Sequence, residues 1–369
     1  MTEQPKPPLE DRIKRMIMST GPISLADYMT LCLYDPDQGY YTAMRPIGAC
    51  GDFITAPEVS QLFGELVGIW LLANWQQSGC PAPFHVVELG PGRGTLMKDI
   101  VRVMSSAPKA KDRLHVHLVE INPALRDEQD KALGEATVAI RWHDTIETLP
   151  KEPLFIIANE FFDCFPIHQW VAKDGKWHER VIGLDQEENL AFGLGPVRAI
   201  INPDQPIKEG SIHEVSPAAD AVFSIIASHL AEFGGAGLFI DYGYSQPDLG
   251  DTLQAIHHHA HANPLHHPGL QDLTSHVNFA NLHMIAMSEL EAKEACNLTA
   301  APLVTQGAFL LAMGLLERAG QLGRGETQAR QESIATDVER LAAPDQMGTL
   351  FKCLAIMPKG SNLPPMTLE

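Results

Sequence analysis

Apolar positions near the start of the chain recur every three to four places, the spacing of one face of an α-helix. Residues 11–19 predict a short amphipathic helix, and residues 23–33 predict a second helix with Ser24 as its N-cap. The run 59–75 is strongly apolar and predicts a long helix packed inside the protein. A stretch rich in glycine, proline and tyrosine separates these two helices, and it is predicted to be a loop.

From Pro83 onward, short apolar runs alternate with helical patterns. These runs predict strands at residues 84–89, 114–120, 137–142, 154–158, 237–241 and 350–357. Helical patterns at 96–104 and 123–133 follow the first two strands. Strands that alternate with helices form a parallel sheet with helices on both faces. The sequence therefore predicts an α/β fold with a doubly wound, Rossmann-like core.

Two long segments depart from this alternation. Residues 170–215 predict short strands with glycine and proline turns, and residues 279–287, 307–319 and 327–341 predict helices before the last strand. We expect a helical N-terminal region, 1–80, that contributes a loop covering the cofactor. We expect the core to span 81–369, with inserted α/β segments at about 164–216 and 245–345 that build the substrate cleft.

Composition and charge narrow the class of function. The chain has 369 residues, 45% of them hydrophobic, and carries 27 basic against 46 acidic side chains, a formal net charge of -19. Such a balance argues against binding to nucleic acid or to an anionic membrane, which needs a clustered basic face, and it suits a basic partner. No apolar run is long enough to span a bilayer, so we expect no membrane insertion.

The six cysteines lie far apart and form no CxxC pair. This spacing predicts neither a disulfide framework nor a zinc site, and it indicates a reducing compartment such as the cytoplasm. A run of histidines between His257 and His267 has no accompanying cysteine and no HExxH helix. We therefore interpret it as a solvated loop and expect no metal site.

The sequence VELGPGRGTL at residues 87–96 carries the strongest chemical signal. Glycines at positions 90, 92 and 94 follow a strand that ends beside Glu88, so the backbone can turn tightly and approach a ligand. Thr95 replaces the third glycine of a dinucleotide motif, and a carboxylate disfavours a pyrophosphate. S-adenosylmethionine has an ammonium, a sulfonium and no phosphate, and suits this turn. A purely structural turn is the alternative.

Two further acidic residues follow predicted strands in register with this turn. Glu120 closes the second strand, where a carboxylate can accept both ribose hydroxyls. Asp144 follows the third strand, where it can accept a hydrogen bond from the adenine amino group. Three such positions together favour a cofactor that contains adenosine.

The sequence NEFFD at residues 159–163 lies at the carboxyl end of the fourth strand, the edge that faces the ligand crevice in open α/β sheets. Glu160 and Asp163 are three residues apart, so on a turn or a first helical turn both can point the same way. Paired carboxylates can hold a guanidinium and align one nitrogen on a methyl donor. The alternative is helix capping, with Asn159 as the N-cap.

The polar, glycine-rich segment 48–60 precedes the long apolar helix. Such a loop can fold over a bound cofactor, with Gly51 and Thr55 as contacts. Alternatively, it is a connection in which Asp52 caps a turn.

Together these segments resemble the MidA-like family of S-adenosylmethionine-dependent methyltransferases, relatives of a mitochondrial complex I assembly factor that methylates protein arginine. The resemblance extends from about residue 22 to 357 and rests on GDFITAPEVSQLFGELVGIW, VVELGPGRGTLM, ANEFFDCFPIHQW, FIDYGY, DLTSHVNF, VTQGAFLLAMG and MGTLFKCLAI. Asn278 stands where the family pattern usually has aspartate.

The resemblance implies a class I methyltransferase core and symmetric dimethylation of an arginine in a complex I subunit. It places Gly51, Asp52 and Phe53 in a loop over the cofactor, and Glu160 and Asp163 toward the substrate as catalytic residues. The residues expected to contact the cofactor are Gly51, Asp52, Phe53, Thr55, Glu88, Gly90, Pro91, Gly92, Gly94, Glu120, Asp144 and Asn159. In a eukaryotic source the expected location is the mitochondrial matrix. Two alternative functions are a methyltransferase with another acceptor and an assembly factor that binds cofactor without turnover.

Overall fold

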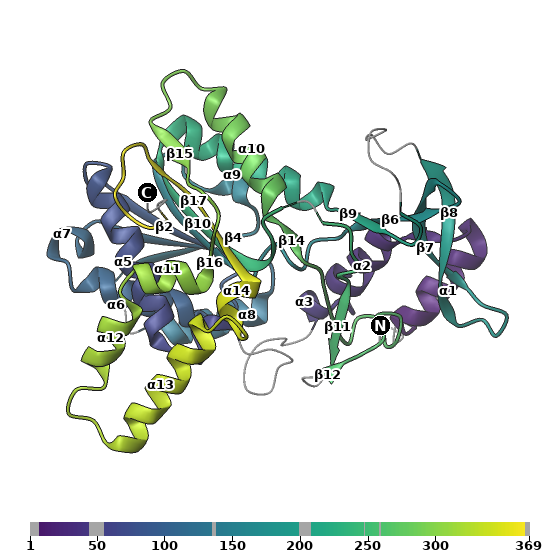
Figure 1. The fold of residues 1–369 in the computed structure, drawn as a ribbon, viewed down its shortest axis with the longest axis horizontal. Coiled ribbons are helices and arrows are strands. Elements are labelled where there is room, and N and C mark those ends of the chain that lie inside the picture. Colours follow the sequence, from purple (N-terminus) through teal and green to yellow (C-terminus); the bar gives the residue numbers. More distant parts are fainter. Residues whose placement is uncertain are drawn as a thin grey trace, which may run out of the picture.

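The computed structural model describes residues 7–43, 55–134, 138–198, 208–246, 248–257 and 260–365. Its larger part is built on one twisted sheet, at the left of Figure 1, and a smaller part lies to its right. Strand order in the large sheet is β15 (Leu298–Ala300), β17 (Phe351–Pro358), β10 (Gly235–Tyr244), β5 (Leu154–Asn159), β2 (Phe84–Leu89), β3 (Leu114–Val119) and β4 (Ala139–His143). The short strands β14 (Val277–Asn278) and β16 (Val304–Thr305) pair with β10 and β17.

Neighbouring strands from β10 to β4 run parallel, whereas β17 is antiparallel to β10. The chain moves outward from β2 to β3 and β4, then returns to the other side of β2 to form β5 and β10. The strand order therefore reverses between β2 and β5, and ligands of open α/β sheets bind outside the carboxyl ends of the strands at that point. The predicted α/β doubly wound core is confirmed.

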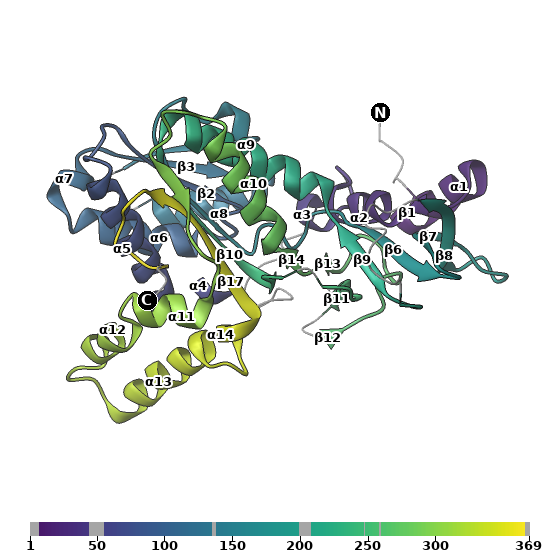
Figure 2. The ribbon, with the colours of Figure 1, turned by 45° about the horizontal axis from the view of Figure 1, so that its top comes forward.

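Helices cover both faces of this sheet, as the two views in Figures 1 and 2 show. The helices of this larger part are α4 (Ala56–Val59), α5 (Gln61–Gln77), α6 (Thr95–Ser105), α7 (Pro108–Lys111), α8 (Pro123–Leu133), α9 (Pro217–Phe233), α10 (Phe279–Glu291), α11 (Gln306–Ala312), α12 (Leu315–Leu322), α13 (Gln328–Ala342) and α14 (Met347–Leu350), of which α12 and α13 extend away from the sheet. A 3-10 turn, Ile146–Thr148, follows β4.

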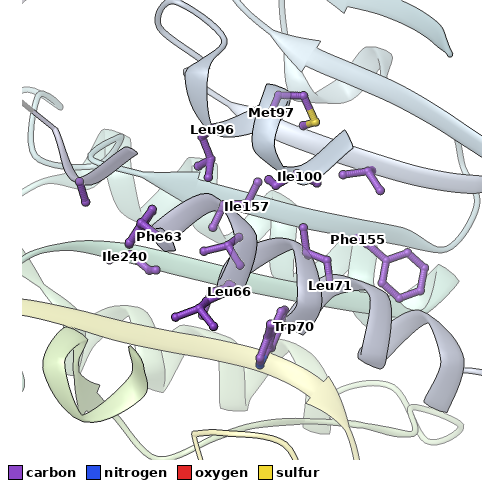
Figure 3. Packing of buried hydrophobic residues seen from close by; sticks show 14 of the residues in the cluster. Phe63, Leu66, Trp70, Leu71, Leu96, Met97, Ile100, Phe155, Ile157 and Ile240 are labelled. Carbon is purple, nitrogen blue, oxygen red and sulfur yellow. The ribbon is translucent and has the colours of Figure 1, made fainter. Parts of the chain in front are cut away.

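Alternate residues of the central strands pack against opposite helical layers. Phe155 and Ile157 of β5 point toward α5 and α6, where Trp70 is fully buried (Figure 3). Leu154 and Ile156 join the cluster formed by α9 and α10 on the other face. This period of two, with apolar residues on both faces, is typical of a parallel strand buried on both sides. This pattern of burial fixes the register of β5. It therefore also fixes the position of Asn159, the last residue of the strand.

The smaller part combines the start of the chain with distant segments. α1 (Leu9–Thr20), α2 (Leu25–Tyr34) and α3 (Tyr40–Ala43) pack beside a sheet of order β1 (Ile23–Ser24), β7 (Lys176–Leu184), β6 (His168–Lys173) and β9 (Ile212–Val215). In that sheet β8 (Leu190–Arg198) pairs with β7. The predicted short strands of residues 170–215 are thus confirmed, and Ser24 caps α2 by accepting a hydrogen bond from the Asp27 N–H at 3.0 Å.

Several predicted boundaries are wrong, for local reasons. The helix predicted at 59–75 is interrupted at Ser60, whose extended backbone separates α4 from α5. The helix predicted at 307–319 breaks at Gly314, which has a φ of 88° in the left-handed region. The third strand, predicted at residues 137–142, is found at Ala139–His143. The histidine run also departs from a plain loop, because β11 (Gln254–His257), β12 (Ala260–His261) and β13 (Asp272–Thr274) form a small antiparallel sheet.

Packing divides the first 80 residues between the two parts. α5 lies in the core beside α6, whereas α1 and α2 contact β7 of the smaller part. No helix in the described ranges is both long and apolar enough to cross a membrane.

Candidate functional site

The glycine turn connects the carboxyl end of β2 to α6. Gly90, Gly92 and Gly94 all have positive φ, at 63°, 52° and 81°, a conformation that side chains disfavour. A Cβ on Gly90 would lie 3.0 Å from Cδ2 of Phe161, so the turn also needs this position to be small. Backbone groups of the turn are therefore exposed to a ligand at the reversal point of the sheet.

Glu88 precedes this turn with a carboxyl group that is 3% exposed. Its Oε2 atom is buried and has no hydrogen-bond partner. Burial raises the pKa of Glu88 to about 8, although a hydrogen bond from the Met97 backbone opposes the shift. A buried carboxyl group with a free oxygen is costly unless a cation or a donor meets it. The site is therefore suited to a ligand with a positively charged end.

Gln129 of α8 joins the glycine turn to the second strand. Its Nε2 donates to the Gly92 carbonyl at 2.7 Å and to Glu120 Oε2 at 3.2 Å, and its Oε1 accepts from Trp142 Nε1 at 2.8 Å. Glu120, directly after β3, is 8% exposed and also accepts from the Asn122 N–H at 2.8 Å. Sequence reasoning found Glu120 but missed Gln129, whose position in a helix carries no pattern.

Asp144 lies after β4, as predicted, but its side chain is 79% exposed. Its Oδ1 pairs with an Arg126 guanidinium nitrogen at 2.5 Å. Arg126 also donates from Nε to the Glu120 carbonyl at 2.8 Å, so it links the ends of β3 and β4. A ligand that contacts the Asp144 carboxylate therefore also lies close to the Arg126 guanidinium.

Glu160 occupies a strained turn directly after β5. It has a φ of 51°, which is uncommon for a residue other than glycine and costs about 1–3 kcal/mol. Its Oε1 accepts from Asn159 Nδ2 at 3.0 Å and from the Ala56 N–H at 3.3 Å. Removal from water and the neighbouring Asp163 raise the pKa of Glu160 to about 8. Asn159 keeps a buried Oδ1 without a partner.

The side chain of Asp241 in β10 stabilises this turn through hydrogen bonds from its backbone. Its Oδ2 accepts backbone hydrogen bonds from Phe161, Phe162 and Asp163 at 3.1, 2.9 and 3.2 Å. The Glu160 N–H donates to the Ile240 carbonyl at 2.9 Å. No helix follows Asn159, so the capping alternative is wrong. Asp241 was also missed, although it is an acidic residue at the end of a predicted strand, the signal that identified Glu120.

The carboxyl of Asp163 has different hydrogen-bond partners from that of Glu160. It is 7% exposed and its carboxyl is hydrogen-bonded to the Tyr242 side chain. Burial raises its pKa to about 6. Glu160 lines both cavities described next, whereas Asp163 lines neither. Of the two carboxyls that were predicted to act as a pair, only Glu160 lines these cavities, while Asp163 is close enough to raise its pKa.

Two adjoining cavities flank the glycine turn. The smaller, of about 410 Å³ including open space, is lined by Glu88, Asn159, Thr55 and the turn itself. The larger, of about 1550 Å³ including open space, is lined by Glu120, Asp144, residues of α2, the segment 160–166 and α9. Gly90, Gly92 and Glu160 line both. Glu160 therefore stands at the junction of the two cavities.

Some predicted residues cannot be placed. Gly51, Asp52 and Phe53 lie outside the described residues, and Thr55 is the first described residue after them. Pro91 and Gly94 belong to the turn, and Pro91 lines the smaller cavity. Within the described ranges, no three histidine, cysteine or acidic side chains are grouped so as to hold a metal ion.

The residues present fit S-adenosylmethionine. The free Glu88 Oε2 and Asn159 Oδ1 can receive donors of the methionine end, because its ammonium carries three N–H groups and a positive charge. Glu120 is buried directly after β3, the place at which nucleotide sites of α/β sheets carry a ribose-binding carboxylate.

Comparisons with known proteins identify similar sequences. Residues 66–296 match the model of a family described as "Putative S-adenosyl-L-methionine-dependent methyltransferase". The protein arginine methyltransferase NDUFAF7 homolog, mitochondrial, of Drosophila melanogaster is 36% identical, over 95% of this chain and 85% of the relative. Protein arginine methyltransferase NDUFAF7, mitochondrial, of Homo sapiens is 33% identical, over 96% of this chain and 85% of the relative.

A solved structure shares the whole fold. A Burkholderia thailandensis protein crystallised with S-adenosyl-homocysteine superposes with a TM-score of 0.79 at 25% identity, covering 98% of this chain and 97% of that chain. S-adenosyl-homocysteine is the demethylated form of the cofactor predicted from residues 87–96.

Proposed function

Because this chain belongs to the family of S-adenosyl-L-methionine-dependent methyltransferases whose model it matches, we propose that its methyl acceptor is an arginine side chain of a protein. Family membership confirms the predicted resemblance, the methyltransferase class of the core and the cofactor. The choice of arginine is supported by relatives at 33–36% identity that are named protein arginine methyltransferases.

Each cofactor-binding role is part of this proposal. Glu88, Asn159 and the glycine turn hold the methionine end in the smaller cavity, and Glu120 accepts the ribose hydroxyls. Asp144, which lines the larger cavity, receives the adenine amino group beside Arg126. When bound, S-adenosylmethionine supplies a methyl group on a positively charged sulfur, which is an activated leaving group.

Glu160 is the residue that we assign to the acceptor. A guanidinium has a pKa above about 12 and no free lone pair at neutral pH, so a carboxylate must orient it and receive a proton. As a nitrogen–methyl bond forms and the sulfur–methyl bond breaks, the sulfur retains the bonding electron pair. The surplus proton of the methylated nitrogen passes to Glu160 and then to water.

The position of Glu160 in the lining of both cavities is the observation that carries this proposal. A side chain at that junction can touch a cofactor in the smaller cavity and an acceptor entering through the larger one. Its raised pKa, about 8, is near that of a general base working at neutral to mildly alkaline pH. Asp163 acts as a supporting carboxylate, because it lines neither cavity and raises the pKa of Glu160.

The substrate protein and the compartment extend the proposal further. Relatives named NDUFAF7 are mitochondrial, and we propose a complex I subunit as the substrate, with symmetric dimethylation supporting complex I assembly. The corresponding compartment is the mitochondrial matrix in a eukaryotic source and the cytoplasm in a bacterial one. The N-terminal residues and the insertions at about 164–216 and 245–345 form the walls of the substrate cleft.

Labelling with cofactor tests the acceptor directly. The purified chain is incubated with methyl-labelled S-adenosylmethionine and host lysate, and labelled protein is hydrolysed to amino acids. Symmetric dimethylarginine in one protein band supports the proposal. Label on another amino acid or on a metabolite contradicts the arginine assignment, and cofactor binding without labelling contradicts turnover. Glu187→Gln, an exposed change in the turn after β7, serves as the matched control for Glu160→Gln.

A further inference from the structure

The lining of the larger cavity extends beyond the residues that we assign to the cofactor. Those residues are Glu120, Asp144 and the glycine turn. The rest of the lining comes from α2, from the segment after Glu160 and from α9. This second part of the lining is therefore available to a different molecule.

Four aromatic side chains belong to this second part of the lining: Tyr34, Tyr41, Phe161 and Phe165, which we call the aromatic compartment. Tyr34 and Tyr41 stack with centroids 5.9 Å apart, and Phe161 and Phe165 meet edge to face at 5.3 Å. Each of these four residues is partly exposed.

Both tyrosine hydroxyls already have partners inside the protein. Tyr34 donates to the Cys164 carbonyl at 3.2 Å, and Tyr41 donates to the Asp272 carboxylate at 2.9 Å. These bonds fix the rings and occupy their hydroxyls, so a ligand can contact the two tyrosines only through ring edges and the faces that are not stacked on each other. Aromatic faces bind cations, and a planar guanidinium can stack on them.

The aromatic compartment adjoins the cofactor site. Phe161 follows Glu160 and packs on the glycine turn, with its Cδ2 atom 3.0 Å from the position of a Cβ on Gly90. Phe161 and Glu160 both line the larger cavity, so a cation on the Phe161 ring is near the glycine turn and shares a cavity with the Glu160 carboxyl.

All the acidic and basic side chains that line the cavity are carboxylic acids. Glu120, Asp144, Glu147 and Glu160 line it, and among its described lining residues there is no lysine, arginine or histidine. Acidic side chains around aromatic walls favour a cation over a neutral group of the same shape. Neither the family match nor the names of the relatives predict that aromatic and acidic side chains line this cavity.

We propose that the aromatic compartment is the specificity site of the enzyme, and that it selects a planar cationic side chain by stacking it against Phe161, Phe165 and Tyr34 beside Glu160. This inference rests on the proposed function, because the arginine side chain is the planar cation of proteins. It adds the means by which arginine is preferred to lysine, whose ammonium is compact, and to a neutral planar side chain.

Equilibrium binding tests the compartment without turnover. Three synthetic peptides that differ only in one central residue, arginine, lysine or citrulline, are titrated into the full chain in the presence of S-adenosyl-homocysteine. We expect arginine to bind at least 10-fold more tightly than citrulline and more tightly than lysine. Equal binding of arginine and citrulline, tighter binding of lysine, or no binding of any peptide overturns the inference. The labelling experiment, by contrast, tests the reaction, so the two failures are distinguishable.

Variants then separate ring faces from simple packing. Tyr34→Leu and Phe165→Leu remove a ring but keep apolar volume, and should weaken arginine binding about 5- to 30-fold while citrulline binding changes little. Tyr34→Phe retains the ring without the hydroxyl and should keep most of the arginine preference. Phe192→Leu, on β8 outside the cavity, controls for the loss of an aromatic ring. Equal effects of the leucine variants on arginine and citrulline would show packing alone and contradict the proposal.

Discussion

The carboxylate of Asp241 accepts a hydrogen bond from the backbone N–H of Phe162 at 2.9 Å. The same oxygen accepts from the residues on either side, so one side chain of β10 fixes the turn that presents Glu160. Burial and the neighbouring Asp163 and Glu160 carboxyls raise the pKa of Asp241, so its accepting oxygen, rather than its charge, supports the strained φ of Glu160. Asp241 is therefore a positioning residue.

Asp241→Asn keeps the shape of this side chain but replaces one of its two accepting oxygens with an amide donor. We expect kcat to fall about 10- to 100-fold, because a displacement of about 1 Å at a reacting group has that cost. The KM for the cofactor should change little, since Glu88 and the glycine turn are separate from this contact. Steady-state kinetics measure both, with Asp345→Asn on the surface as the control. An equal loss in both parameters would indicate general disruption instead.

The buried Glu88 carboxyl lowers the stability of the ligand-free protein, and the same group is assigned to cofactor binding. Its folded pKa, about 8, lies above its ordinary value of 4.5. Between those two values the unfolded chain has lost the proton that the folded chain retains, so Glu88 costs stability as the pH rises toward 8. Glu88→Gln should raise the free energy of unfolding of the ligand-free protein at pH 8 by about 1–3 kcal/mol.

The same change should weaken S-adenosyl-homocysteine binding at least 10-fold, because the ammonium loses its carboxylate. Denaturant unfolding and calorimetric titration measure the two effects, with Glu187→Gln as the control. A less stable variant with unchanged affinity would refute the assignment of Glu88.

Three buried histidines form a hydrogen-bonded chain across the core sheet. His117 contacts His85 Nδ1 through Nε2 and His143 Nε2 through Nδ1, both at 2.9 Å. Burial lowers the pKa of His117 to about 3, so the folded protein keeps it neutral. Below pH 6.5 the unfolded chain binds protons that the folded chain does not, and stability is lost as the pH falls.

We expect His117 alone to contribute a slope of about 1.4 kcal/mol per pH unit below pH 6.5. His117→Asn should lower stability at pH 7 but flatten its dependence on pH between 6 and 4, as measured by denaturant unfolding. His261→Asn, at an exposed position, should leave the slope unchanged. A parallel curve for His117→Asn would contradict this account.

The sequence predicted the core because its strands and glycine turn depend on local patterns. Glu88, Glu120 and Glu160 were identifiable as acidic residues at strand ends, since parallel strands bring those ends to one edge. Gln129 and Asp241 could not be assigned roles in advance, because their contacts join residues 37 and about 80 positions away. The same limit applies to the smaller part, in which β1 pairs with β7.

Helix boundaries failed where a single residue overrides periodicity. Ser60 interrupts an apolar run that reads as one helix, and Gly314 adopts a left-handed conformation that ends α11 and begins α12. The orientation of Asp163 was also beyond prediction. Spacing alone placed it beside Glu160, whereas its partner Tyr242 belongs to β10.

The pH dependence of the reaction should follow Glu160. Its pKa is about 8, and only the ionised carboxylate can hold a guanidinium and accept a proton. At saturating cofactor, kcat/KM for an arginine peptide should therefore rise as the pH increases from 6 to 8 and become level above that value. A profile that falls over this range would show that the protonated form is the active one.

Single-turnover methyl transfer by Glu160→Gln tests the central claim, that Glu160 acts on the acceptor at the junction of the two cavities. Enzyme in excess over labelled cofactor is mixed with the protein substrate, and the cofactor affinity of the same preparation is measured by calorimetry. We predict a rate at least 100-fold below that of the unaltered chain and of Glu187→Gln, with cofactor affinity within about 3-fold. Transfer at the unaltered rate would remove Glu160 from the mechanism.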